Sequence, residues 1–220
     1  MKKIHIRITF VEPLLGTAPN NPQIYDEFIA SKAPDAEKRE EEVARLGADA
    51  VAEKSMTVFL RDTDGNPIIW NHHIKGFFKE ACGHLQRMKG EALAKHSAKL
   101  KAYKKVIDGC IEPIGSNDLT REIRLDMPEG AEIKLFQRPI RGRTAQGERI
   151  ALTSSEMIPA GTTATFYVLC PDEYESAVCE WLTYGRLHGL NQWRSAGFGR
   201  FTYEVLDVES ITSIIHLSDG

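Results

Sequence analysis

The sequence predicts an α+β fold in which an antiparallel sheet carries helices on one of its faces. Two observations favour this fold class. Residues 2–12 alternate isoleucine or phenylalanine with polar side chains, as a strand with one buried face does. Residues 162–170 form an apolar run of β-branched and aromatic residues, which is typical of an interior strand. Helix-like segments separate these strands from the others, so we expect the helices to pack on a single face of the sheet.

Composition limits the class of protein further. A hydrophobic content of 42% in 220 residues is enough for a sizeable core. The net charge of −3 excludes a protein that binds nucleic acid over its whole surface, but it allows a local basic groove. No run is apolar and long enough to span a membrane, and the N-terminus lacks an apolar signal core. We therefore expect a cytoplasmic protein that is not attached to a membrane.

The cysteines give no sign of a metal centre. They show neither C-x-x-C spacing nor histidines at the intervals of a zinc site. The four are Cys82, Cys110, Cys170 and Cys179. We expect reduced thiols, no bound metal and no cofactor.

The chain contains one acidic and two basic stretches. Residues 35–53 hold seven acids against three basic residues, which predicts a solvated acidic helix within an insertion at 24–54. Residues 75–105 hold nine lysines and arginines against Glu80 and Glu91, in a long helix that opens near Asn71. Such a charged stretch is either an ordinary soluble face or a surface that binds phosphates. Residues 137–152 are rich in arginine and predict a basic finger or hairpin.

The order of all these segments outlines a ferredoxin-like or RNA-recognition-type sheet. A strand is followed by a hairpin, a helix, further strands, a second helix over residues 172–187, a glycine-rich loop and a last strand. We expect a single domain over residues 1–220, with the acidic helical insertion at 24–54 and the basic finger at 137–152.

The glycine-rich loop, GLNQWRSAGFGR, is the clearest candidate for a binding site. Gly197 and Gly199 flank Phe198, so the backbone near the tip is able to turn through positive φ or lie close to a ligand. Arg194 and Arg200 bracket the tip with planar guanidinium groups that suit phosphate oxygens. The alternative is a glycine-rich hairpin whose arginines lie in solvent.

Three stretches together resemble the RAMP superfamily of CRISPR-associated RNA-binding proteins. Residues 67–81, PIIWNHHIKGFFKEA, resemble the family's strand that runs into an apolar-Lys-Gly turn and a helix. Residues 154–166 resemble the strand and turn before its last helix, and residues 189–201 resemble its glycine-rich loop. The resemblance is strongest to the backbone subunits, and it implies single-stranded guide RNA, further copies of the chain along that RNA and other effector subunits as partners. It also implies a role in antiviral defence.

The resemblance and the chemistry of the side chains select the same residues. Cations hold the phosphate backbone of single-stranded RNA, and planar side chains stack on its bases. The candidates for RNA binding are Lys75, His72, His73, Arg141, Arg143, Trp193, Arg194, Arg200, Gly197 and Gly199. Phe198 is a further candidate for stacking, with a place in the core as its alternative.

The sequence is also compatible with two other functions. Some RAMP relatives cleave RNA with a histidine or with a metal-binding aspartate, and Asp26 is the one early acid at a suitable position. Asp26 is also well suited to begin a helix, so we favour binding over catalysis. The other alternative is a protein-interaction module that never binds RNA, such as a phage-encoded relative that blocks an effector.

Overall fold

The computed structural model describes residues 1–20, 56–88, 90–115, 120–144 and 147–211. Two compact units share the chain and are described separately. Unit 1 contains Met1–Leu14, Arg61–Ala131 and Pro159–Gly220, and unit 2 contains Leu15–Leu60 and Glu132–Ile158. The range predicted as a basic finger, 137–152, falls in unit 2. The acidic insertion at 24–54, with Asp26, lies outside the described residues.

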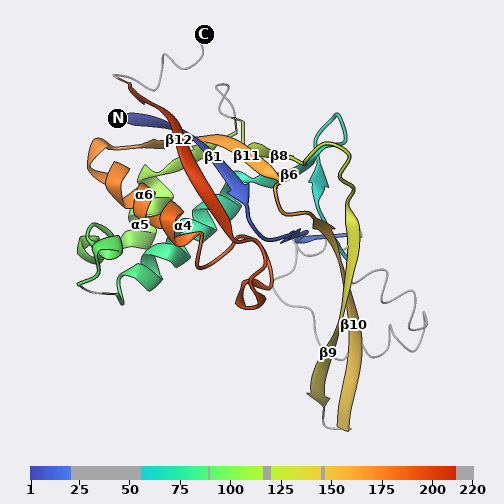
Figure 1. The fold of residues 1–220 in the computed structure, drawn as a ribbon. Helices are drawn as coiled ribbons and strands as arrows, with labels where there is room; N and C mark the ends of the chain where they lie inside the picture. The colour runs from blue at the N-terminus through green and yellow to red at the C-terminus, as the bar shows by residue number, and fades with distance from the viewer. Residues whose placement is uncertain (21–55, 89, 116–119, 145–146, 212–220) are drawn as a thin grey trace. The chain divides into compact units, whose positions relative to one another are not determined.

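Unit 1 has the ferredoxin-like topology that the sequence predicts (Figure 1). Strand β1 (Lys2–Phe10) pairs antiparallel with β12 (Phe201–Ser210) on one side and with β11 (Thr163–Cys170) on the other. Strand β7 (Glu112–Ile114) pairs antiparallel with the far side of β11. Helix α4 (Asn71–Leu85) lies between β1 and β7 in the chain, and α6 (Glu175–Tyr184) lies between β11 and β12. The α+β prediction is therefore confirmed.

Further strands extend the sheet beyond this four-stranded centre. Strand β8 (Glu122–Asp126) pairs with the beginning of β11, and β6 (Pro67–Trp70) pairs with β8. Strand β5 (Leu60–Arg61) follows β6 in the order of the sheet. Because β6 runs directly into α4, the sheet fixes where that helix begins.

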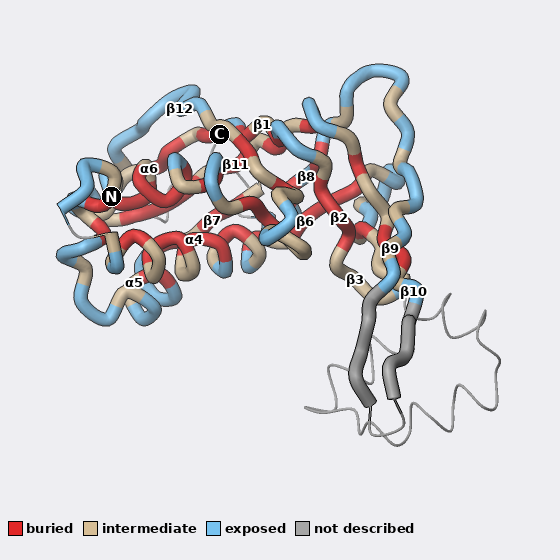
Figure 2. The backbone as a smooth tube through the Cα atoms, turned by 60° about the horizontal axis from the view of Figure 1, so that its bottom comes forward, coloured by how far each residue is buried: buried red, intermediate tan, exposed pale blue. Residues whose placement is uncertain are grey.

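The core of unit 1 lies between the sheet and the helices. The isoleucines of β1, together with Phe10, are at most 1% exposed, and their side chains alternate with polar ones as the sequence predicts. The apolar stripe of α4 is also buried, at Ile74, Phe77, Phe78, Ala81 and Leu85. Helices α4, α5 (Tyr103–Cys110) and α6 lie on the same side of the sheet (Figure 1). Buried residues recur along α4 and α6 (Figure 2), and α5 buries Ile107.

The long helix expected after Asn71 is shorter than predicted. Helix α4 ends at Leu85, and two 3-10 turns, η1 (Ala92–Ala94) and η2 (Ser97–Lys99), precede α5. Gly90 and Ala102 have positive φ angles of 92° and 49°, which an α-helix does not accommodate. These two positions divide the basic stretch into separate short elements.

Unit 2 contains a long antiparallel hairpin. Strand β9 (Lys134–Thr144) pairs with β10 (Gly147–Ile158) from Met157 opposite Lys134 to Gly147 opposite Thr144. The other strands of its sheet are β2 (Leu14–Leu15), β3 (Ala18–Pro19) and β4 (Thr57–Val58). The range predicted as a basic finger or hairpin, 137–152, lies within this β9–β10 hairpin.

None of the helices in the described parts of the chain combines the length and the apolar character needed to cross a bilayer.

Candidate nucleic-acid interface

The first turn of α4 carries Lys75 in an internal ion pair. Its ammonium group contacts Glu112 Oε2 at the start of β7. The other oxygen of this carboxylate accepts a hydrogen bond of 2.8 Å from Asn71 Nδ2. Glu112 thus offsets the positive charge of Lys75, which the sequence predicts to contact a phosphate. The ion pair also joins α4 to β7.

Both histidines of this turn have a pKa below the ordinary value for histidine. His72 is exposed and His73 is half-buried, and their rings meet edge to face with centroids 4.6 Å apart. Burial, with a smaller effect from the charge of His72, lowers the pKa of His73 to about 4. Burial also lowers the pKa of His72. These side chains offer hydrogen bonds to a ligand, but they offer no positive charge.

The glycine loop, residues 189–200, closes on its own backbone. Leu190 N donates to Gly199 O at 2.9 Å, and Gly199 N donates to Pro13 O at 2.8 Å. A Cβ atom on Gly199 would lie 2.3 Å from Leu190 O, and one on Gly189 would lie 2.2 Å from Phe198 O. Glycine is needed at these two positions because the two ends of the loop approach each other closely.

The tip of the loop is shaped by positive φ angles. Trp193 has a φ of 55° and Gly197 a φ of 94°. The rings of Trp193 and Phe198 stack on each other, with centroids 5.1 Å apart and 15° between their planes. A base would therefore stack on the opposite face of one ring or separate the pair.

The two arginines of the loop differ in their contacts. The Arg194 guanidinium forms an ion pair with Glu80 Oε2 on α4. The Arg200 guanidinium lies over Gly197, 3.6 Å from where a Cβ atom would be, and its buried Nε has no hydrogen-bond partner among the described residues. Arg194 thus anchors the loop to α4.

The predicted residues fall into three groups. The loop holds Trp193, Arg194, Gly197, Gly199 and Arg200, and the first turn of α4 holds His72, His73 and Lys75. Arg141 and Arg143 belong to β9 of unit 2, and their side chains lie outside the description. Contact of any of these residues with RNA stays a prediction.

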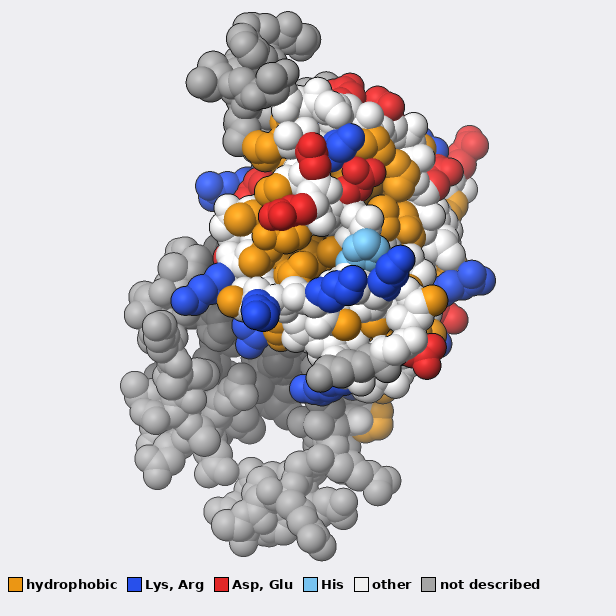
Figure 3. Space-filling model, turned by 90° about the vertical axis from the view of Figure 1, so that its left-hand side faces the viewer, with side chains coloured by type: hydrophobic (Ala, Val, Ile, Leu, Met, Phe, Trp, Pro, Cys, Tyr) orange, Lys and Arg blue, Asp and Glu red, His pale blue; other side chains and the backbone are white. Residues whose placement is uncertain are grey.

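Sequence reasoning did not single out one group of exposed cations. Residues 95–105, which we term the lysine segment, hold five exposed lysines whose ammonium groups form no ion pair with any described residue. They are Lys95, Lys99, Lys101, Lys104 and Lys105. Figure 3 shows lysine and arginine side chains in a row across one face of the molecule. The local excess of positive charge in the sequence was the signal for them.

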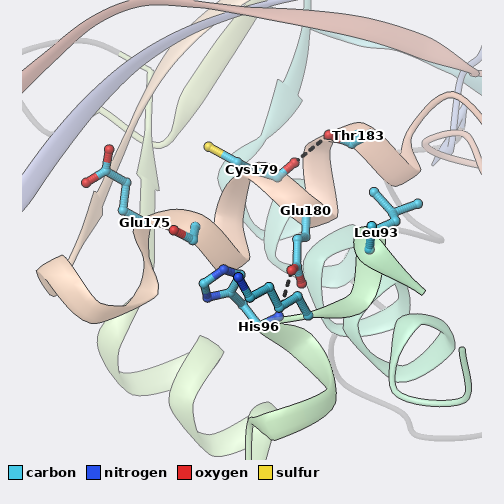
Figure 4. Close-up of a pocket in the computed structure, with 9 residues that line it drawn as sticks. Leu93, His96, Glu175, Cys179, Glu180 and Thr183 are labelled. Carbon is cyan, nitrogen blue, oxygen red and sulfur yellow. Dashed lines mark hydrogen bonds between the residues drawn. The ribbon is translucent and has the colours of Figure 1, made fainter. Parts of the chain in front are cut away.

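A buried carboxylate holds the lysine segment against α6. Glu180 is 8% exposed, and it accepts hydrogen bonds of 2.7 Å from the backbone N–H groups of His96 and Ser97. The Ser97 hydroxyl also donates to Glu180 Oε2 at 2.6 Å, and Trp181 Nε1 donates to that hydroxyl at 3.1 Å. Figure 4 shows Glu180 pointing from α6 toward His96 at a groove of about 340 Å³ that Leu93 and Thr183 also line.

On the face of the sheet away from the helices, the polar residues of β1 and β12 carry more negative than positive charge. Arg7 Nη1 donates to Glu204 Oε1 at 2.9 Å, so this cation is already paired. The carboxylates of β12 lie across from the polar residues of β1, with Glu204 opposite Arg7, Asp207 opposite His5 and Glu209 opposite Lys3. Three acids against two strong cations disfavour a polyanion on this face.

Comparison with known proteins finds similarity in structure but none in sequence. No family model and no curated protein matches the chain. Among solved structures, a chain in the cryo-EM structure of the Type III-B Cmr-beta bound to cognate target RNA is similar, with 12% sequence identity and a TM-score of 0.49. The match covers 94% of this chain and 60% of that chain, so this chain spans less than two thirds of that chain's length.

Proposed function

We propose that this protein binds single-stranded RNA by its phosphate backbone, with the lysine segment as the main contact. The observation that carries the proposal is the charge of that segment. Five exposed lysines lie within eleven residues, and none pairs with a described carboxylate, in a chain whose net charge is −3. The chain thus concentrates unpaired positive charge at one place.

Binding of this kind requires no base recognition. Lysine ammonium groups act as point charges that displace condensed counterions from the phosphates. On single-stranded RNA, each phosphate that the protein neutralises makes the logarithm of the affinity fall by about 0.7 for every tenfold increase in salt concentration. The affinity is therefore steeply dependent on salt and nearly independent of sequence.

The partner that we propose is the guide RNA of a CRISPR effector. The support is the resemblance of residues 67–81, 154–166 and 189–201 to the RAMP superfamily, together with the ferredoxin-like order of strands in unit 1. Within that proposal, the glycine loop and the first turn of α4 make additional contacts, copies of the chain line up along the RNA, and other effector subunits join them. The protein then serves antiviral defence without being the nuclease.

The test compares two double variants of equal charge. Retention of a labelled single-stranded RNA is measured by filter binding between low and moderate salt. We expect Lys101→Ala with Lys104→Ala to weaken binding about tenfold and to lower the salt slope by about 1.4. Arg7→Ala with Arg124→Ala removes the same charge from strands of the sheet, so its effect is expected to stay within about twofold.

Four outcomes would count against the proposal. If the protein retains no RNA even at low salt, the proposed RNA binding is wrong. If the two double variants lose RNA affinity equally, the lysine segment is not the binding site. If the protein cleaves the RNA in the presence of magnesium and Asp26→Ala abolishes the cleavage, the protein is an endoribonuclease. A stable protein complex formed without RNA affinity would favour a protein-interaction module.

A further inference from the structure

Three potential metal ligands converge between α4 and the residues that follow α6. His188 Nε2 lies 2.9 Å from Glu80 Oε1, and His84 Nε2 lies 4.0 Å from the same oxygen. One ligand atom from each residue lies within 4.8 Å of the others. The sequence predicted no metal site, because His188 is 108 positions from Glu80 and only the fold brings them together.

The fold holds each of these side chains in place. Glu80 and His84 are four residues apart on α4, so both project from the same side of the helix. The backbone N–H of His188 donates to Tyr184 O at 3.0 Å, which fixes His188 to the last turn of α6. The Tyr184 ring stacks on His84, with centroids 5.8 Å apart and 21° between the planes.

We propose that Glu80, His84 and His188 bind a divalent transition-metal ion of the zinc type, with water completing its coordination. Bonds of about 2.0–2.1 Å in a tetrahedral zinc site put neighbouring ligand atoms about 3.3 Å apart. The separations of 2.9 and 4.0 Å from Glu80 Oε1 lie on either side of that value, and no two of the three ligand atoms are more than 4.8 Å apart. Two imidazoles and one carboxylate favour zinc or nickel over magnesium or calcium.

The surroundings allow the ion to enter. The three side chains are between 22% and 39% exposed, so solvent reaches them. Arg194 contacts the other oxygen of the carboxylate, Glu80 Oε2, which leaves Oε1 directed at the histidines. Its positive charge opposes a nearby cation, so we expect the affinity to be moderate.

Metal binding would connect the glycine loop to α4. His188 immediately precedes Gly189, and Glu80 already contacts Arg194 within the loop. An ion held between α4 and His188 would therefore restrict the beginning of the loop. This inference is independent of the proposed function, since it requires no RNA.

The experiment is calorimetric titration of the full chain with zinc chloride, without RNA and after removal of metals by a chelator. We expect one zinc ion per chain, and binding at least about tenfold weaker in His84→Ala, in His188→Ala and in Glu80→Gln. His72→Ala serves as the matched control, because His72 is exposed and lies at the other end of α4. Magnesium chloride should give no heat at the same concentrations.

Circular dichroism and melting temperatures in chelator establish that the variants are folded. Zinc should raise the melting temperature of the wild type and of His72→Ala, but not that of the folded His84→Ala or Glu80→Gln variants. Zinc binding that persists in all three ligand variants, or that is lost only in Cys110→Ser, would overturn the site. Absence of zinc binding to the wild type in molar excess would overturn it as well.

Discussion

The glycine loop and the lysine segment both carry cations, but they use carboxylates in different ways. In the loop, Glu80 of α4 forms an ion pair with the cation itself, Arg194. In the lysine segment, the acid of α6 meets the backbone, because Glu180 accepts from the N–H groups of His96 and Ser97. The lysines around that backbone keep their charge for a ligand. The charge of a residue in the sequence therefore differs from the charge that the folded surface offers.

The largest effect is expected from removing the acid beneath the lysine segment. Glu180→Ala would leave two backbone N–H groups and the Ser97 hydroxyl without their acceptor in a buried place. We expect the free energy of unfolding to fall by about 3–5 kcal/mol, since hydrogen bonds to charged groups are the strong ones. Urea denaturation measures this change.

A control on the same helix sharpens the result. Glu175 lies in the first turn of α6, and Glu175→Ala should cost only about 0.5 kcal/mol through the helix dipole. In a folded Glu180→Ala variant, RNA affinity should also fall, because the lysines lose their fixed positions. Equal stabilities of the two variants would show that Glu180 does not anchor the segment.

The second test concerns the closed end of the glycine loop. Gly199 has a φ of 71°, and an added Cβ would overlap Leu190 O at 2.3 Å. We expect Gly199→Ala to lower the free energy of unfolding by about 3 kcal/mol, from backbone strain and overlap together. Gly197→Ala should cost about 1 kcal/mol, because only its φ of 94° opposes the change and no atom lies nearer than 3.6 Å.

Thermal and urea denaturation of the two glycine variants are the measurement. If both cost the same, the loop is held by its φ angles alone and not by the close approach of its ends. RNA binding adds a second comparison. If RNA lies against the tip of the loop, Gly197→Ala should lower the RNA affinity more than it lowers the free energy of unfolding.

The third test asks whether the first turn of α4 supplies a cation at mildly acidic pH. The folded pKa of His73, about 4, lies below the unfolded value near 6.5. Above pH 6.5 both states are neutral, so stability is complete there. As the pH falls from 6.5 toward 4, the unfolded state takes up a proton that the folded state does not, and stability is lost.

The variant His73→Gln isolates this effect. Its unfolding free energy should fall less steeply between pH 6.5 and 4 than that of the wild type. RNA affinity should respond equally in the two proteins between pH 7.5 and 6, because His73 stays neutral throughout. A parallel loss of stability in both proteins would show that His73 titrates normally.

The fold was more predictable than the lengths of its elements. Two local patterns, the alternation in residues 2–12 and the apolar stripe beginning at Ile74, predict which side chains are buried. The structure buries these side chains. The end of α4 was not predictable in this way. Gly90 and Ala102 take positive φ angles, and the acid that binds the segment at His96 comes from α6, 84 residues away. Distant contacts of this kind leave no periodic signal.

The candidate site shows the same limit. The sequence identified the glycine loop from its composition, but it could not show that Gly199 and Gly189 are required by the backbone of the loop itself. It also could not show that Lys75 and Arg194 pair with Glu112 and Glu80. Side chains that are far apart in the sequence decide which cations remain available. The excess of lysine in 75–105 was visible, but which of its members stay exposed depends on the fold.

The smallest effect is expected from Arg194, and it tests most directly the difference between the glycine loop and the lysine segment. Because Glu80 offsets its charge, Arg194→Ala should weaken RNA binding by about twofold to threefold in the presence of a chelator. Arg200→Ala should act similarly or more strongly, since the Arg200 guanidinium forms no ion pair with any described residue. Filter binding measures both variants beside Lys101→Ala. A loss at Arg194 larger than the loss at Lys101 would mean that RNA separates the ion pair on binding, and the glycine loop would then replace the lysine segment as the principal contact.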